Sequence, residues 1–205
     1  IEKRAFNFSF IETITIPSHV TQICESAFNG CTKLNEIIFP PNSELQIIEK
    51  SAFAGSSIEK ITIPSHVTQI CKLAFNNCIQ LKEIIFMPNS ELQIIGKYSF
   101  SCTSIESITI PSHVKQIGKY VFNECTKLKE IIFLPNSELQ IIEKFAFNES
   151  SIESITIPSH VKKICEYAFN SCTKLKEILF PQNSELQIIE KYAFVDSSIE
   201  KVTIP

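Results

Sequence analysis

The sequence has 205 residues, of which 44% are hydrophobic and 20% are charged, and its formal net charge is −3. This composition provides ample apolar material for a core, and the interleaved charges include no basic run of the kind that binds nucleic acid. No apolar stretch reaches the ~20 residues that a helix needs to cross a bilayer. The sequence also begins and ends inside a repeat and carries no secretion leader, so we expect an excerpt of a longer protein.

A 47-residue repeat runs through the whole sequence. Copies of Ile-Pro-Ser-His-Val begin at Ile16, Ile63, Ile110 and Ile157. A fifth copy opens at Ile204. Each repeat contains two similar halves of 23 or 24 residues. Such periods are typical of repeat architectures in which each unit contacts only its neighbours, so we expect one solenoid over residues 1–205 with partial repeats at both ends.

Nine runs of the form L/I-x-x-I-x-I/F predict short strands. They begin at Ile11, Leu34, Ile58, Leu81, Ile105, Leu128, Ile152, Leu175 and Ile199. Their alternating tails are a strand pattern, and the prolines that follow most of them end a strand because proline cannot donate to the ladder. The connections between runs are long enough for parallel strands. We therefore predict one parallel sheet of about nine short strands.

The connection after each strand contains Ala-Phe or a close variant, which we interpret as one short helical turn that places its phenylalanine in the core. The nine phenylalanines are Phe6, Phe28, Phe53, Phe75, Phe100, Phe122, Phe147, Phe169 and Phe194. Complete burial of one such ring contributes roughly 1.5–3 kcal/mol. Strands and turns together predict an α/β repeat, a solenoid with the sheet on one side and short helical turns and loops on the opposite side.

The cysteines and histidines recur at repeat positions. The cysteines are Cys31, Cys78, Cys125 and Cys172 in one position, Cys24, Cys71 and Cys165 in a second, and Cys102 without a counterpart; the histidines are His19, His66, His113 and His160. Equivalent residues of successive repeats would lie two strands apart, or roughly 10 Å, which is too far for a disulfide or a shared metal ion. We expect mostly reduced, buried thiols and solvated histidines, with pairing or reactivity of some cysteines as the alternative.

The order of strand, proline, Ala-Phe and cysteine in L-x-x-I-x-I-P-x-x-V-x-x-I-x-x-x-A-F-x-x-C-x-x-L resembles the BspA-like subclass of leucine-rich repeats. The resemblance covers essentially the whole chain, although the family's glycine after the isoleucine is kept only at Gly96 and Gly118. Repeats of this subclass occur in surface proteins of host-associated bacteria and parasitic protists. The resemblance implies a leucine-rich-repeat solenoid at the cell surface, extracellular, that attaches to host cells or matrix proteins or aggregates cells.

One candidate binding surface is the outward position of the predicted concave sheet. Its residues are Thr15, Ile38, Thr62, Ile85, Thr109, Ile132, Thr156, Leu179 and Thr203. Outward strand positions are normally polar, so the four aliphatic residues indicate a protein-binding surface. The β-propensity of isoleucine and threonine is an equally open explanation.

A second candidate surface lies on the lateral or convex side. The residue before the Ala-Phe position is aromatic in the last five copies, namely Tyr98, Tyr120, Phe145, Tyr167 and Tyr192. Aromatic residues are enriched at interfaces, which favours partner binding or self-association. Edge-on stacking between coils is the structural alternative.

The sequence predicts a binding protein rather than an enzyme. Catalysis needs unlike groups that converge at one place, whereas nearly every polar residue here is a repeat copy, with Asp196 the only aspartate and Arg4 the only arginine. We expect no cofactor or metal, and a host surface or matrix protein, or a second copy of the chain, as partner. The alternative is a structural spacer or self-associating stalk. Asn7 and Asn148 begin N-glycosylation patterns whose use the sequence leaves open.

Overall fold

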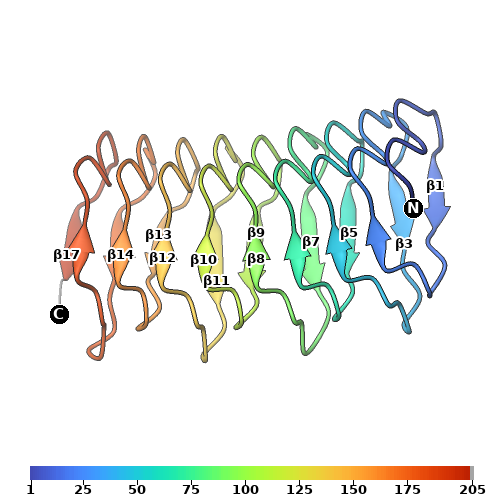
Figure 1. The fold of residues 1–205 in the computed structure, drawn as a ribbon. Helices are drawn as coiled ribbons and strands as arrows, with labels where there is room; N and C mark the ends of the chain where they lie inside the picture. Colours follow the sequence, from blue (N-terminus) through green and yellow to red (C-terminus); the bar gives the residue numbers. More distant parts are fainter. Residues whose placement is uncertain (204–205) are drawn as a thin grey trace.

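The computed structural model describes residues 1–203, which form coils stacked in chain order along one axis, with each coil beside the next (Figure 1). Two sets of parallel strands alternate along the chain and lie on opposite sides of the stack. The predicted fifth repeat, which opens at Ile204 and Pro205, lies outside the described residues.

The odd-numbered strands coincide with the nine predicted runs, and we call the surface that they form the long-strand face. They are β1 (Thr13–Thr15), β3 (Glu36–Ile38), β5 (Lys60–Ile63), β7 (Glu83–Phe86), β9 (Ser107–Ile110), β11 (Glu130–Phe133), β13 (Ser154–Thr156), β15 (Glu177–Leu179) and β17 (Lys201–Thr203). All nine predicted strands are therefore present within residues 1–203. They form four separate sheets, however, in the orders β1-β3, β5-β7, β9-β11 and β13-β15-β17.

The even-numbered strands form an eight-stranded parallel sheet that the sequence reading did not predict, here called the short-strand sheet. They are β2 (Gln22–Ile23), β4 (Ile47–Ile48), β6 (Gln69–Ile70), β8 (Ile94–Ile95), β10 (Gln116–Ile117), β12 (Ile141–Ile142), β14 (Lys163–Ile164) and β16 (Ile188–Ile189). Each of the six inner strands pairs with the equivalent residues of both neighbouring coils, as in Ile70 with Ile48 and Ile95. This side of the stack is thus hydrogen-bonded without interruption from β2 to β16.

The expected helical turns at the Ala-Phe segments are wrong. Residues 1–203 contain no helix, and these segments are consecutive tight turns. In each coil the residue before the Ala-Phe position is left-handed, as in Ser51 (φ 54°) and Tyr120 (φ 58°). An α-helix is 10–12 Å wide, whereas coils joined by parallel strands repeat every ~4.8 Å, so stacked helices would force the coils apart. The tight turns instead donate alternate N–H groups to the next coil, as from Phe122 to Ala146 (2.8 Å).

The core between the two sets of strands is built around the nine predicted phenylalanines. Seven of their side chains, from Phe28 to Phe169, have no exposed surface, and those of Phe6 and Phe194 are partly buried. The rings stack in one continuous file, with centroids 4.9–5.8 Å apart and interplanar angles of 2–18°. The predicted file of core phenylalanines is confirmed.

All eight cysteines are free thiols. One set of four donates a hydrogen bond to the main-chain carbonyl of the phenylalanine in the preceding coil, as from Cys125 Sγ to Phe100 O (3.1 Å) and from Cys78 Sγ to Phe53 O (3.0 Å). Burial raises the pKa of Cys78 to about 11 and that of Cys125 to about 12. Cys78 and Cys125 are therefore protonated at neutral pH, and the hydrogen bonds of all four thiols tie one coil to the next.

Candidate functional site

The predicted lane of outward residues lies on the long-strand face as expected. Seven of its nine members are exposed, and the side chains of Thr62 and Ile85 are half-buried. The aliphatic members Ile38 and Ile132 have 44% and 42% of their surface exposed, although each sits in a strand whose inward neighbour, such as Ile131, is buried. The structure thus places apolar side chains in solvent at regular intervals along this face, while their role in binding stays a prediction.

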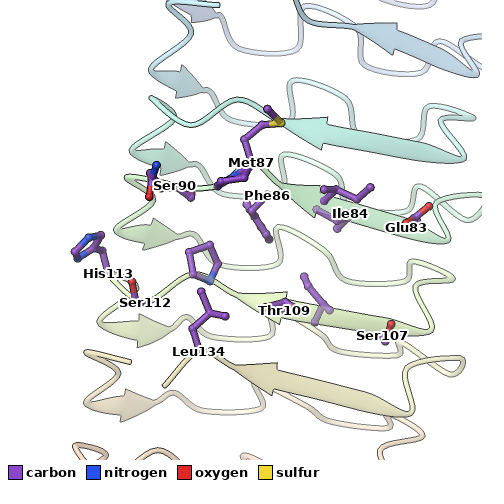
Figure 2. Close-up of a pocket in the computed structure, with 15 residues that line it drawn as sticks. Glu83, Ile84, Phe86, Met87, Ser90, Ser107, Thr109, Ser112, His113 and Leu134 are labelled. Atoms are coloured by element: carbon purple, nitrogen blue, oxygen red, sulfur yellow. The ribbon is translucent and has the colours of Figure 1, made fainter. Parts of the chain in front are cut away.

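The long-strand face is interrupted by grooves that the sequence reading missed. Two grooves, of about 660 and 680 Å³, lie at the breaks between β7 and β9 and between β11 and β13, and a smaller one of about 130 Å³ lies between β3 and β5. In the first groove, Phe86 is the last residue of β7 and Met87 follows it, Thr109 lies on β9, and Leu134 reaches in from the coil beyond (Figure 2). His113 and Ser90 stand at its outer edge. Each break therefore presents apolar side chains beside polar loop groups.

Loop length distinguishes the coils on the two sides of each groove. The segment between β7 and β8 spans residues 87–93, whereas the segment between β9 and β10 spans only residues 111–115. The longer loop carries an exposed apolar residue, Met87 (38% exposed), and Leu134 (41% exposed) has the same position one repeat later. The sequence signal was present, because Met87 and Leu134 stand where Pro40 and Pro181 occur in the other two repeats.

The predicted lateral aromatics lie on the tight turns, where each is the left-handed residue before the Ala-Phe position. Their rings stack face to face rather than edge-on, with centroids 4.5 Å apart between Tyr98 and Tyr120 and 5.2 Å apart between Tyr167 and Tyr192. Four of the five are half-buried and Tyr192 is 55% exposed. Stacking between coils therefore occupies most ring faces and leaves ring edges at the surface, and a role in partner binding is untested.

The histidines lie at exposed loops, and three of them contact a glutamate of the following coil. The distances from Nδ1 to Oε1 are 3.0 Å for His66 and Glu91, 2.9 Å for His113 and Glu138, and 2.8 Å for His160 and Glu185. The hydrogen bond from His160 is the main cause of a lowered pKa at Glu185. Among residues 1–203, no group of three or more His, Cys, Asp or Glu side chains is placed to hold a metal ion.

A membrane-spanning helix is absent from residues 1–203.

Asn148, one of the two glycosylation candidates, is buried, and its Nδ2 donates to Asn123 Oδ1 at 2.8 Å. The folded chain therefore does not offer Asn148 to a glycosylating enzyme.

The chain is similar to several solved repeat structures. A leucine-rich repeat protein of T. pallidum is 25% identical, with a TM-score of 0.60, over 87% of this chain and 71% of that one. A leucine rich cell surface protein of Faecalibacterium prausnitzii is 24% identical, with a TM-score of 0.49, over 91% of this chain. The pneumococcal vaccine antigen PcpA is 24% identical, with a TM-score of 0.46, over 85% of this chain. The chain spans 59% and 57% of the length of the latter two.

The family comparison agrees with the coil geometry. The likeness to the T. pallidum protein confirms the leucine-rich-repeat solenoid. A search of curated proteins finds no match. The model for the BspA type leucine rich repeat region matches with six copies, over residues 1–129 and 93–205. The chain therefore belongs to the BspA-type leucine-rich repeat family.

Proposed function

We propose that this chain is the protein-binding repeat region of a cell-surface, adhesin-like protein, and that the long-strand face holds a host-cell or matrix protein. The observation that carries the proposal is the series of grooves at the sheet breaks, each flanked by exposed aliphatic side chains. Exposed apolar patches on a folded surface mark interaction sites, and anchors that enter such pockets dominate binding energy. The F. prausnitzii protein is described as a cell surface protein, which supports the proposed location.

The side chains of the grooves are better suited to binding a protein than to catalysing a reaction. The side chains in the groove between β7 and β9 are mainly apolar or neutral, and the charged member Glu83 is paired with Lys60 at 2.7 Å. His113, at the edge, faces Glu138 (2.9 Å) rather than a nucleophile. The arrangement offers apolar anchoring sites with polar rims, which is the anatomy of a protein interface. We therefore propose binding, not catalysis, as the activity of this face.

The test compares variants of the groove with variants of equal hydrophobicity elsewhere. Met87→Ser combined with Leu134→Ser removes the apolar residues of the longer loops, and Ile79→Ser combined with Ile94→Ser is the control, because both control residues are exposed away from the grooves (59% and 46%). Binding to intact host cells and to purified matrix proteins is measured by surface plasmon resonance and flow cytometry. We expect the groove variant to lose binding by about tenfold or more, as for other interface anchors, and the control to retain it.

The alternative function is a structural spacer or self-associating stalk. The uninterrupted short-strand sheet and the stacked lateral aromatics favour it, because the sheet joins the coils from β2 to β16 and the aromatic stack joins the last five coils. Light scattering after size exclusion separates the two functions. A monomer that binds neither cells nor matrix proteins would support the spacer, whereas loss of self-association in Tyr120→Ser with Tyr167→Ser would support a stalk.

A further inference from the structure

A file of lysines runs along the tight turns beside the aromatic rings. Its position immediately precedes the left-handed residue of each coil. The residues in chain order are Lys3, Glu25, Lys50, Lys72, Lys97, Lys119, Lys144, Glu166 and Lys191. Five consecutive coils, from Lys50 to Lys144, therefore present a lysine at one position, which we call the lysine file.

The two glutamates neutralise the file at both ends. Glu25 contacts Lys3 at 2.6 Å and Lys50 at 2.7 Å, and these contacts lower the pKa of Glu25 to about 2. Glu166 pairs in the same way with Lys144 and with Lys191. The two glutamates thus pair with the lysines on either side of a central segment, and the central segment itself contains no glutamate at this position.

The central lysines, Lys72, Lys97 and Lys119, are exposed, and within residues 1–203 none of them forms an ion pair. The position before them is a glutamate in other coils, as at Glu49 and Glu143, but not here. Their positive charge is therefore not compensated by an ion pair with any residue that the structure describes.

In two of the three central coils, steric contact explains why no glutamate precedes the lysine. The position before the lysine is Gly96 and Gly118 there, and Cys71 in the third coil. A Cβ atom at Gly96 would lie 2.7 Å from main-chain atoms of Cys71 and Lys72, and one at Gly118 would lie 2.7 Å from Ile95 O. The close approach of the coils leaves no room for a carboxylate side chain at either position.

The lysine file follows the regular spacing of the coils, and the stacked aromatic rings border part of it. The adjoining rings of Tyr98 and Tyr120 repeat at 4.5 Å, and those of Tyr120 and Phe145 at 4.8 Å. Lys97 Nζ lies 5.1 and 5.5 Å from the centroids of Tyr98 and Tyr120. An atom almost equidistant from two stacked rings lies beside the stack, so the ammonium group of Lys97 lies at the ring edges. Lys144 Nζ, which is 5.9 Å from the centroids of both Phe145 and Tyr167, lies in the same way. The surface is therefore a row of lysines on successive coils, part of which borders the stacked rings.

We propose that the lysine file binds a linear polyanionic polysaccharide, such as a sulfated glycan, laid along the solenoid axis. The lysines do not converge on one point, so they suit a polymer with a charge at regular intervals rather than a small anion. Each sugar of an extended chain advances by a distance comparable with one coil. The Debye length is about 8 Å at physiological ionic strength, so acids several coils away act weakly on the central lysines, and Glu49 and Glu143 lie only in the coils that border them.

The same geometry disfavours nucleic acid. Proteins that hold single strands stack bases on free aromatic faces, whereas the faces of Tyr120 and Phe145 are covered by neighbouring rings. Duplex DNA or RNA presents two curved rows of phosphates, which a single straight file cannot follow. The lysine file lies on the turns and not on the long-strand face, so this inference is independent of the proposed protein-binding grooves.

The test uses size-defined heparin oligosaccharides as the probe, with binding measured by surface plasmon resonance at physiological salt. The variant is Lys72→Gln, Lys97→Gln and Lys119→Gln together. The matched control is Lys82→Gln, Lys129→Gln and Lys176→Gln, which removes three lysines from one position of the long-strand face in alternate coils. We expect the file variant to bind heparin about tenfold more weakly, or ~1.4 kcal/mol, with a smaller dependence on salt. The control should change binding by less than about twofold.

Three results would overturn the inference. The first is equal loss in the file variant and its control, which would show an effect of net charge only. The second is no binding of heparin by the unaltered protein at physiological salt. The third is single-stranded DNA of equal charge binding as tightly as heparin with the same dependence on the file. Thermal unfolding of each variant keeps a folding defect apart from a loss of contacts, because exposed lysines contribute little to stability.

Discussion

The short-strand sheet and the long-strand face are built from the same coils, yet only the former is continuous. The short strands pair in one order from β2 to β16, whereas the long strands separate after β3, β7 and β11. Each separation follows a coil with the longer loop, such as residues 87–93, and precedes a coil with the shorter one, such as residues 111–115. β15 is also followed by a longer loop, residues 180–187, and yet it pairs with β17. Within residues 1–203, three of the four longer loops therefore coincide with a break in the long-strand face, and none of them interrupts the short-strand sheet.

The comparison separates a stabilising side from a side available for binding. Beneath the short-strand sheet and the turns lie the phenylalanine file, the thiol hydrogen bonds and the inter-coil hydrogen bonds of the turns. The long-strand face carries exposed aliphatic residues and the grooves. Substitutions on the two sides should therefore differ strongly in their effect on the free energy of unfolding.

The clearest contrast is expected at the phenylalanine file. Phe122 has no exposed surface and stacks on Phe100 and Phe147, so Phe122→Ala leaves a cavity between two coils and should lower the free energy of unfolding by about 3–5 kcal/mol. Urea denaturation followed by circular dichroism measures the loss. Ile132→Ala on the long-strand face is the control and should cost less than about 1 kcal/mol, because the side chain is already 42% exposed. Similar losses in both would contradict the division into two sides.

A smaller effect is expected where coils approach most closely beside the short-strand sheet. In Gly96→Ala the new Cβ atom would meet Cys71 C and Lys72 N at 2.7 Å. These are main-chain atoms that can only give way by a shift of the coil, so we expect a loss of about 1–3 kcal/mol, read from thermal unfolding. Cys71→Ala is the control, because it also places an alanine at this position, in the neighbouring coil, but removes an atom instead of adding one. A fully stable Gly96→Ala would mean that the coil spacing is adjustable.

The buried thiols give a test that does not depend on a change of sequence. Burial raises the pKa of Cys78, Cys125 and Cys172 from 9.0 to about 11, 12 and 11. Since the thiolate is the reactive form, these three should resist alkylation by iodoacetamide at pH 8 until the chain unfolds. Peptide mass spectrometry with and without urea measures the labelling, and half-buried Cys102 serves as the internal comparison. Rapid labelling of Cys125 in the folded chain would contradict the inter-coil hydrogen bond.

The weakest expected effect concerns the ion pairs at the edge of the turns. Hydrogen bonds from Lys3 and Lys50 lower the pKa of Glu25 from 4.5 to about 2. A carboxyl whose pKa is depressed on folding adds stability above its unfolded pKa and loses it as the pH falls through the folded value. Stability from Glu25 should thus be present at pH 7 and disappear between about pH 4.5 and 2. Melting temperatures of Glu25→Gln and the unaltered chain should converge over this range, and a constant difference would argue against the ion pairs.

Much of this architecture follows from residue order, because the interactions involved are local or repeat exactly. Spacing and side-chain type predict the 47-residue period, the nine runs that become the odd-numbered strands, and the file from Phe6 to Phe194. The solvent exposure of Ile38 and Ile132 follows in the same way from strand alternation. Proline after each run likewise marks where the long strands end.

Other features depend on how adjacent coils meet, which residue order does not contain. Coils that repeat at strand spacing have no room for helices, so Ser51 and Tyr120 adopt left-handed turns that share hydrogen bonds with the next coil. Two-residue strands such as β8 are too short to give a pattern and exist only through pairing with β6 and β10. The grooves and the uncompensated lysines of the lysine file arise because residues more than 20 positions apart become neighbours only after stacking. Contacts between coils, rather than preferences within them, therefore decide which surfaces are open.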